Sequence, residues 1–556
     1  MDFKVEPIDL IHDKFIEKNE HDRVLRCTVF CHDEINVEKI EAAVNLLVKK
    51  VPILNTVLID DGKKLYWHER KTTEGIFKVF SKVTYFDAEY TSVIDETTEP
   101  QFKTLVIGST ICFLVNNMLM DLYGFKNLLY LFFDLYNNAN GNENYHSSYE
   151  ANHSRDIKEY LKTVDYKSGK FNLLKLCNKN FNLVRLPDSE LLDDKAFTLT
   201  HQIQINEFEY DKLEEICQAT NHTITNVIFA AYHRAVANVC KINDTHINIA
   251  RFFDGREFSK VNNYISLSNI HTILPYSLYF DEDDTFEQTL EKITKTDNLI
   301  RKNHLVEKKI SCNPKKLYKD TEYFQYCNIG PLSVYAFDMH DNSIKNVVFT
   351  TACREHPNLA IASSIFDRKI SLTAMNNCTL SNHKFIMYFL EWMVYEIKTF
   401  IFNHDKNFFV NPETSIYAED SYNSNEYEDS ILDANKMFEN IQVIKNTNEV
   451  EKDFKEAEEK LEKRIEEKKE ALEQKAEEKS EKKAKKVTKK EDANSISEET
   501  KSLIEKFSKV ANKTPDEIQI IDNNTVRYLN TINGKSVWQK RSIKELEKYI
   551  AYKENK

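Results

Sequence analysis

The sequence is poor in glycine and lacks any long hydrophobic run. Only nine glycines occur in 556 residues, whereas average usage is about 7%. No apolar stretch reaches the roughly 18 residues that a transmembrane helix needs. Residues 1–6 lack the basic start and apolar segment of a signal peptide. We therefore expect a cytoplasmic protein with no membrane span.

Cysteine and histidine are present but form no disulfide or metal-binding pattern. The ten cysteines are scattered without paired Cys-x-x-Cys motifs, and most stand beside apolar residues. This usage is typical of small core residues in a reducing compartment. The sixteen histidines show no ligand spacing with the cysteines. We therefore predict no zinc or other metal site.

The overall composition is that of a large folded protein with an acidic balance. Hydrophobic residues make up 41% of the chain and aromatic residues 12%, enough to bury a large core. The length suggests about two to four domains. The formal net charge of -13 argues against a general nucleic-acid surface, although one segment is locally basic. A nucleic-acid partner is accordingly not expected for the chain as a whole.

A strand, a short polar loop and a helix are predicted between residues 111 and 136. Residues 111–115 form a short apolar run, as in a buried strand, and residues 116–122 follow as a loop. From Gly124 onward, apolar residues recur at steps of three and four: Leu128, Leu129, Leu131, Phe132, Leu135 and Tyr136. A polar loop between buried elements is a common place for a functional site. An Asn-rich turn followed by a helix cap explains the same residues, and both interpretations stay open.

The layout of this stretch resembles a known signature. Strand, His-His-x-x-x-Asp-Gly and helix mark the condensation domains of nonribosomal peptide synthetases and related acyltransferases of the chloramphenicol acetyltransferase type. In that family the second His is the base or positioning group for attack of an amine or alcohol on an acyl thioester. The Asp is structural and the Gly lets the chain bend. The matching residues are Asn117, Asp121 and Leu122, and a carboxamide such as that of Asn117 cannot act as a base.

A second departure from the family pattern stands upstream. Residues 37–51 have a helical period, Pro52 stops that helix, and residues 53–59 read as a strand with a hairpin partner at 65–67. In the family this strand begins Pro-x-Leu-Arg, and the Arg supports the motif Asp by a salt bridge. Asn55 replaces that Arg. The resemblance thus predicts that Asp121 has lost its cation, and the three departures together favour inactivation.

Further segments resemble the family in the same order along the chain. Asp254-Gly255-Arg256 is similar to its Asp-x-Arg turn, and residues 326–332, which include Asn328, to its Ser-Asn-Leu-Gly strand. Arg256 also fits a surface ion pair and Asn328 a simple turn. The remaining similar segments are 266–269, 273–275, a final strand at 370–375 and a final helix at 382–402.

The resemblance implies an α/β fold of two chloramphenicol acetyltransferase-like lobes, mixed sheets with helices, set as a V-shaped pair around a tunnel. The expected bounds are 1–165 and 166–405, with the loop 116–122 in the middle. Asn117 and Asp121 occupy the catalytic positions. No permanently bound cofactor is implied; the acyl donor would be a thioester of coenzyme A or of phosphopantetheine on a carrier protein. The substrate-binding positions are Asn116, Leu122, Tyr123, Gly124, Asn55, Arg256 and Asn328.

The chain changes character after residue 405. Residues 406–450 read as a linker, and 451–492 as a solvated charged helix or a weak coiled coil. The basic run from Lys482 to Lys490 fits a solvated charge run, or else a contact with RNA or anionic lipid. Residues 493–556 have the pattern α-β-β-β-α, with Asn533-Gly534 as a hairpin turn. We expect a small module that, with the helix, contacts a protein partner.

Two classes of function follow from the sequence. One is a catalytically impaired protein of the condensation fold that binds or scaffolds. The other is an acyltransferase with an altered centre, which moves an acyl group from a thioester to an amine or alcohol. The loss of the base at Asn117 favours the first.

Overall fold

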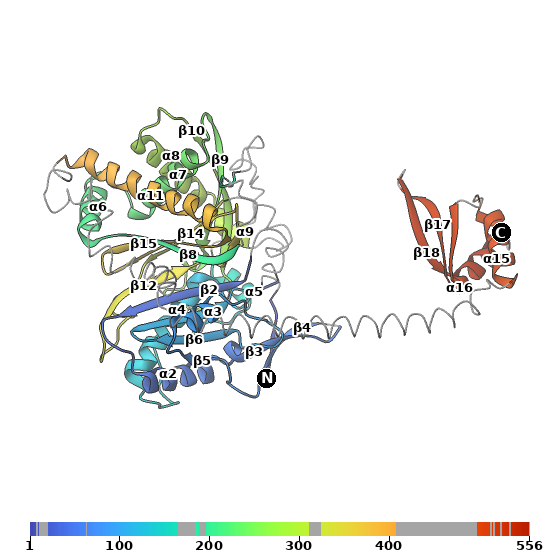
Figure 1. Cartoon of the computed structure of the whole chain (residues 1–556), viewed down its shortest axis with the longest axis horizontal. Coiled ribbons are helices and arrows are strands. Elements are labelled where there is room, and N and C mark those ends of the chain that lie inside the picture. The colour runs from blue at the N-terminus through green and yellow to red at the C-terminus, as the bar shows by residue number, and fades with distance from the viewer. Residues whose placement is uncertain are drawn as a thin grey trace, which may run out of the picture. The chain divides into compact units, whose positions relative to one another are not determined.

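The computed structural model describes residues 1–6, 9–10, 21–62, 64–164, 184–187, 196–310, 324–406, 408, 498–511, 514, 517–522, 525–532 and 535–554. The chain divides into two compact units, Met1–Asn425 and Glu426–Lys556 (Figure 1). Apart from residues 406 and 408, the predicted linker and the predicted charged helix lie outside the described residues.

The first lobe is built on a five-stranded sheet in the order β12-β2-β7-β6-β5. Alternate residues of β7 enter two cores. Phe113 and Val115 pack with α2 and α4, whereas Cys112 and Leu114 pack with Phe86 of α3. Helices therefore cover both faces of the sheet, and β7 is buried on both sides. The elements are β2 (Val24–Cys31), α2 (Val37–Lys50), β5 (Phe77–Val79), α3 (Val83–Tyr90), β6 (Phe102–Ile107), β7 (Thr110–Asn116), α4 (Leu122–Asp134) and β12 (Ile344–Thr350).

One strand of this sheet comes from the second half of the chain. β12 pairs antiparallel with β2, so that Val347 lies opposite Val29. The sequence pattern had placed these residues in the second lobe. An apolar strand carries no local mark of the sheet that it joins, and the pairing is visible only in three dimensions.

A small sheet of β1 (Asp2–Lys4), β4 (Leu65–Glu69) and β3 (Thr56–Asp60) flanks the first lobe. The predicted hairpin of β3 and β4 is confirmed. The predicted strand start at residue 53 is wrong, because Pro52–Asn55 forms a short 3₁₀ helix, η1. Proline at the first position of η1 suits helical geometry, since its fixed φ and missing N–H cost nothing there.

The second lobe is built on a seven-stranded sheet in the order β10-β9-β11-β14-β15-β13, with β8 paired to β15. Its helices pack on this sheet in one large core, in which Val227, Phe389 and Ile361 are buried. The elements are α5 (Ile157–Thr163), β8 (Phe197–Ile205), α6 (Glu207–Thr220), α7 (Ile224–Val239), β9 (Thr245–Asp254), η4 (Gly255–Phe258), β10 (His271–Phe280), α8 (Phe286–Lys302), α9 (Leu305–Ile310), β11 (Phe324–Pro331), β13 (Arg354–Glu355), β14 (Ala360–Phe366), β15 (Lys369–Cys378) and α11 (Leu380–His404).

Helix α7 is capped at its start and buried along most of its length. Thr223 caps the helix by accepting a hydrogen bond from the Asn226 backbone N–H. His233, in the middle of the helix, is 1% exposed. Burial lowers the pKa of the His233 imidazole to about 3. The residue lies on the buried side of an almost fully buried helix, which its neighbours in sequence do not reveal.

The two lobes share one apolar core. Cys327 and Ile329 of β11 and Phe366 of β14 belong to the same buried cluster as Phe113 and Phe125 of the first lobe. One face of the second sheet therefore packs on the first lobe. The loop between β7 and α4 lies at this junction.

The second unit confirms the predicted α-β-β-β-α order. Its sheet is antiparallel in the order β16-β17-β18. Phe507, Val526, Leu546 and Ile550 form its buried core. The elements are α15 (Glu498–Ala511), β16 (Ile518–Asp522), β17 (Thr525–Ile532), β18 (Lys535–Ser542) and α16 (Ile543–Glu554).

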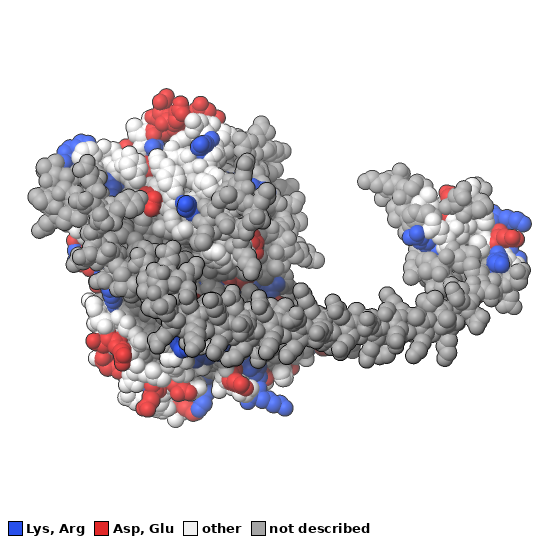
Figure 2. Space-filling model, viewed as in Figure 1, with Lys and Arg blue, Asp and Glu red and all other residues white. Residues whose placement is uncertain are grey.

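The surface of the first unit carries charges of both signs. On the face drawn in Figure 2, described Lys and Arg residues are interspersed with described Asp and Glu residues. In the described part of the chain, none of the helices has the length and apolar character needed to cross a membrane.

Truncation tests where the first unit ends. Phe408 is 3% exposed in the second-lobe core and stacks on Phe208 at 6.1 Å between ring centroids. Removal of residues 426–556 should leave the melting temperature of the first unit nearly unchanged. Removal of residues 406–556 deletes Phe408 and should lower the melting temperature by a few degrees. Differential scanning calorimetry of the two truncations compares them directly, and equal melting temperatures would contradict a structural role for Phe408.

Candidate functional site

The loop between β7 and α4 is held by its own polar groups. The Asn116 side-chain Nδ2 donates to Gln101 Oε1 at 2.8 Å, and its Oδ1 accepts from the Met118 backbone N–H at 2.9 Å. The Asn117 backbone N–H donates to the Arg23 carbonyl at 2.7 Å. Asn116 is 1% exposed. Asn116 therefore shapes the loop, because its amide nitrogen and its amide oxygen are both hydrogen-bonded within the first lobe.

Two side chains from later in the chain also bind this loop. Asn269 Nδ2 donates to the carbonyl oxygens of Asn117 and Met118, each at 3.0 Å. Arg155 donates to the Leu119 carbonyl and, at 2.7 Å, to the Leu267 carbonyl. These contacts confirm that residues 116–122 lie between the lobes.

Asp121 is the most heavily bonded residue of the loop. One carboxylate oxygen, Oδ1, caps α4 by accepting from the Gly124 N–H at 2.7 Å, and Oδ2 accepts from the Ile270 N–H at 2.7 Å. Arg256 Nη1 lies 3.0 Å from Oδ1. Burial alone would raise the pKa of this carboxyl, but the charge of Arg256 and these hydrogen bonds hold the pKa well below its usual range. Asp121 is thus ionised and joins the two lobes.

The predicted loss of a cation beside Asp121 is wrong. Arg256 supplies the cation from η4, and three further hydrogen bonds fix its guanidinium on the carbonyls of Ser266 and Ser268. Arg256 is 7% exposed, so it is not a surface ion pair. Asn55 instead donates to the Thr72 carbonyl at 3.1 Å and accepts from Arg70 at 3.1 Å. The cation thus reaches Asp121 from the second lobe.

Two glycines allow this close approach. A Cβ on Gly124 would lie 3.0 Å from Arg256 Nη2, and a Cβ on Gly255 would lie 2.4 Å from the Ile270 carbonyl. The expectation that position 122 needs the freedom of glycine is wrong. Leu122 begins α4 with ordinary helical geometry and has no positive φ. The glycines that this junction needs are therefore Gly124 and Gly255, where room is short.

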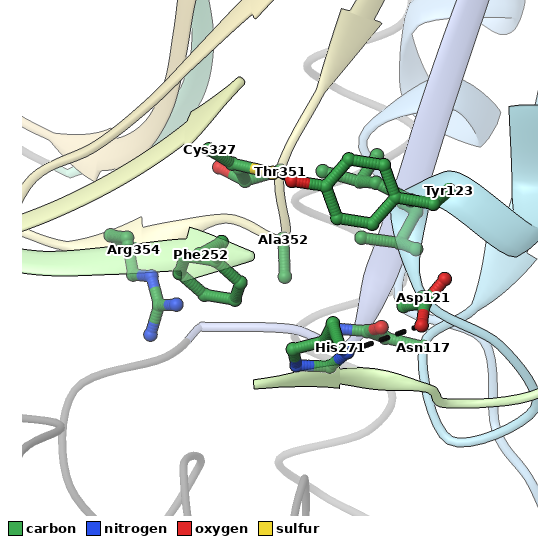
Figure 3. A pocket seen from close by; sticks show the side chains of 11 residues that line it. Asn117, Asp121, Tyr123, Phe252, His271, Cys327, Thr351, Ala352 and Arg354 are labelled. Carbon is green, nitrogen blue, oxygen red and sulfur yellow. Dashed lines mark hydrogen bonds and ion pairs between the residues drawn. The ribbon is translucent and has the colours of Figure 1, made fainter. Parts of the chain in front are cut away.

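Next to Asp121 lies a small, partly open cavity of about 20 Å³, shown in Figure 3. A cavity of this size holds about one water molecule. The resemblance had implied a tunnel at this place. The residues that line the cavity are Leu25, Asn117, Asp121, Leu122, Tyr123, Phe252, His271, Cys327, Thr351, Ala352 and Arg354.

The predicted site residues separate into two groups. Four of them, Asn117, Asp121, Leu122 and Tyr123, line the cavity. The others lie outside the lining. Asn328 accepts from Ser363 Oγ at 2.9 Å, and its carbonyl accepts from the Tyr123 hydroxyl at 3.0 Å. It lies within β11 and is not a turn. Asn116, Gly124 and Arg256 shape or brace the loop, and Asn55 bonds elsewhere in the first lobe.

His271 is the cavity residue that sequence reasoning missed. It begins β10, its Nδ1 lies 3.5 Å from Asp121 Oδ2, and its ring stacks on Phe252 at 5.4 Å between centroids. Figure 3 shows the ring beside Asn117 and Asp121. Nothing in the segment 266–275 marks this histidine. The signal is its register opposite Asp254 at the end of β9, which places it at the lobe junction.

The chemical capacity of the cavity is limited. Asn117 can donate and accept hydrogen bonds but cannot take up a proton. Burial raises the pKa of the Cys327 thiol to about 12, so this thiol stays protonated and is a poor nucleophile. An ionised Asp121 beside His271 is the one acid–base pair in the lining. Among the described residues no group of three His, Cys, Asp or Glu side chains could hold a metal ion.

No family model and no curated protein matches this sequence. Solved structures match in fold. The first condensation domain of the CDA synthetase aligns with a TM-score of 0.53, covering 71% of this chain and 95% of its own, at 9% identity. The trichothecene 15-O-acetyltransferase from Fusarium sporotrichioides aligns at 0.52 over 71% and 95% at 13% identity. The polyketide synthase associated protein 5 from Mycobacterium tuberculosis aligns at 0.51 over 71% and 97% at 11% identity.

These comparisons establish the fold and nothing finer. The chain has the two-lobed α/β architecture of condensation domains and chloramphenicol acetyltransferase-like acyltransferases, which confirms the fold predicted from the sequence. Identities of 9 to 13% are too low to carry activity across.

The Asp121–Arg256 pair gives a prediction about stability. Asp121→Asn leaves the buried Arg256 with Asp254, 2.9 Å away, as its remaining counter-charge, and should cost about 3 kcal/mol of unfolding free energy at pH 7. The folded-state pKa of Asp121 is depressed. Its contribution is therefore complete above the unfolded value of about 3.9 and disappears as the pH falls below it.

Urea unfolding of wild type and variant at pH 7 and at lower pH tests this. The difference between the two proteins should narrow as the pH falls below about 4. Asp211→Asn removes the exposed ion pair with Arg368 and should cost less than about 1 kcal/mol at any pH. An equal cost for the two variants at pH 7 would refute the role assigned to Asp121.

Proposed function

We propose that this protein is a non-catalytic binding or scaffolding protein built on the condensation-domain fold. The observation that carries the proposal is the reaction centre: at the position of the family base stands the carboxamide of Asn117, 9% exposed, in a cavity of about 20 Å³. Position 117 therefore lacks the proton acceptor that acyl transfer requires, and the cavity beside it is small.

The interactions around the centre support the proposal. The Asp121–Arg256 pair, the Asn269 contacts and the cap of α4 hold the loop at the junction of the lobes. These interactions stabilise the junction of the lobes whether or not a reaction takes place there. A protein that uses the fold as a binding surface needs this framework but needs no base.

The partner that we propose is a protein, with an acyl carrier protein as the first candidate. Several solved structures with this fold are parts of peptide and polyketide synthases by their own descriptions. Carrier proteins present acyl groups on phosphopantetheine, and a condensation-like surface without chemistry would bind or position one. The C-terminal unit is a second element through which a protein partner would be held.

Acyl-transfer assays test the absence of catalysis. We predict no thioester consumption above the buffer rate with a panel of acyl coenzyme A and acyl carrier donors and with amine or alcohol acceptors. Asn117→Ala should leave this baseline unchanged, because the amide moves no proton. Turnover at about 1 s⁻¹ or faster that Asn117→Ala abolishes would show that Asn117 acts by orientation or by oxyanion stabilisation.

A second candidate function is acyl transfer by an altered centre, and His271 specifically favours it. Its imidazole stands across the same cavity with Nδ1 3.5 Å from the ionised Asp121. A carboxylate beside one ring nitrogen orients an imidazole and favours the other nitrogen as the proton acceptor. The second lobe would then supply the base that position 117 lacks.

Activity measured with His271→Ala separates the two candidates. Under the altered-centre mechanism, wild type consumes thioester and His271→Ala loses about 10²–10⁴-fold in rate. Under the non-catalytic proposal, the two proteins give the same buffer-level rate. The variant His271→Gln keeps much of the side-chain volume and serves as the control for packing.

A further inference from the structure

Helix α11 has an inner and an outer face of different character. On the inner face Phe389, Met393 and Ile397 are fully buried in the second-lobe core. On the outer face Tyr388 and Tyr395 are 47% and 58% exposed. Figure 1 shows α11 as the orange helix that lies across the second lobe. The outer face is therefore accessible to a partner.

Three aromatic rings follow one another on this outer face. The ring centroids of Tyr388 and Trp392 are 5.8 Å apart, and those of Trp392 and Tyr395 are 5.4 Å apart. Steps of four and three residues keep the three rings on one side of the helix. Tyr and Trp are enriched where proteins bind one another, because each combines a large apolar ring with a polar tip. We call Tyr388, Glu391, Trp392 and Tyr395 the α11 face.

The central ring of the α11 face is fixed by the protein itself. Trp392 Nε1 donates to Glu396 Oε1 at 3.2 Å, and Glu396 Oε2 accepts from Arg234 Nε at 2.7 Å. The Trp392 ring also packs against the second-lobe core. Binding of a partner to this ring therefore costs little side-chain entropy at Trp392.

Glu391 places a negative charge within this row of rings. The residue is exposed, and in the part of the chain that the structure describes no basic side chain forms an ion pair with its carboxylate. The basic residues nearby are paired with other carboxylates, Arg234 with Glu396 and Lys398 with Glu209. Partial burial raises the pKa of the Glu391 carboxyl. A cation beside it would therefore be stabilised.

A cation suits this combination of side chains better than other ligand classes. The faces of Trp and Tyr rings attract Arg and Lys cations, and more strongly so when water is excluded. The Glu391 carboxylate adds a charge of the opposite sign. The same carboxylate would repel an anion such as a nucleic-acid strand, and a lipid surface would have to bury it without a partner.

The shape of the α11 face indicates that the cation is a side chain of a protein. Residues 388 and 395 are about 10 Å apart along the helix axis at 1.5 Å per residue, the length of roughly three residues of extended chain. Small organic cations are held in cages of aromatic rings, whereas these rings form a row on an exposed helix. A row accommodates one basic side chain at its centre and the flanking residues on the outer rings.

We propose that the α11 face binds an extended segment of a partner protein, with an Arg side chain stacked on Trp392 and paired with Glu391. Arg fits better than Lys because its flat guanidinium stacks on aromatic rings and binds a carboxylate through two hydrogen bonds. The proposal does not depend on whether the centre at Asn117 is catalytic or on which partner binds there.

Peptide selection with the full chain tests the proposal. The probe is a phage-displayed library of peptides of about 12 residues, with one fixed central Arg and random flanks. Selected peptides are synthesised with a fluorescent label, and their affinities are measured by anisotropy. Trp392→Ala should weaken binding about tenfold, and Tyr395→Ala and Glu391→Gln should each weaken it about threefold to tenfold.

A double-mutant cycle tests the contact between the peptide and Glu391. Replacing the central Arg of a selected peptide by Gln should lower its affinity for the wild-type chain about tenfold. The same replacement should cost only about threefold or less with Glu391→Gln, because the charge pair is already absent. Equal costs for the two chains would contradict the assigned contact.

Matched controls assign the effect to α11. Tyr85→Ala removes an exposed ring from α3, and Glu41→Gln removes an exposed carboxylate from α2. Both changes should leave the affinity for the peptides unchanged. Replacing the lysines between Lys482 and Lys490 by Gln should also leave it unchanged. Thermal melting of each variant checks folding.

Four results would overturn the proposal. The first is that no peptide is selected, and the second is that the α11 variants bind as well as the Tyr85 and Glu41 controls. The third is a gain of about tenfold in peptide affinity when the lysines between Lys482 and Lys490 are replaced, which would mean that the chain's own basic run occupies the α11 face. The fourth is a dimer, seen by sedimentation, that Trp392→Ala dissociates, which would make a second copy the occupant.

Discussion

The structure of the first unit depends on one buried carboxylate. Asp121 caps α4, accepts the Ile270 N–H and pairs with Arg256, so one side chain sets the loop, the helix start and the fit of the lobes. A buried charge is tolerated only when it is paired and hydrogen-bonded. A Cβ at Gly124 would crowd this pair, and a Cβ at Gly255 would collide with the Ile270 carbonyl. These contacts also shape the neighbouring cavity.

The residues that hold the loop in place differ from the residue at the position of the family base. Asp121, Arg256 and Asn269 hold the loop, whereas the base position carries Asn117, whose amide cannot take up a proton. His271, from the second lobe, places an imidazole beside Asp121, the carboxylate that joins the two lobes. Acyl transfer at this centre would therefore depend on Asn117, on His271 and on a cavity of about 20 Å³.

Sequence patterns predicted what is local and missed what is tertiary. The β7–loop–α4 unit and the C-terminal α-β-β-β-α order follow from periodicity and turn chemistry over a few residues. Arg256 meets Asp121 across 135 positions, β12 joins the sheet of the other lobe, and His271 gains its place from pairing with β9. Such contacts leave no local periodic trace. The resemblance supplied the fold, but it assigned the cation of Asp121 to position 55.

The central claim is that the centre at Asn117 performs no acyl transfer. Single-turnover thiol release, with the protein in excess over acyl coenzyme A and an amine acceptor, tests it most directly because even one slow event per molecule is detected. The account predicts release at the rate of thioester hydrolysis in buffer, unchanged by Asn117→Ala and by His271→Ala. Release faster than in buffer that either substitution removes would contradict it.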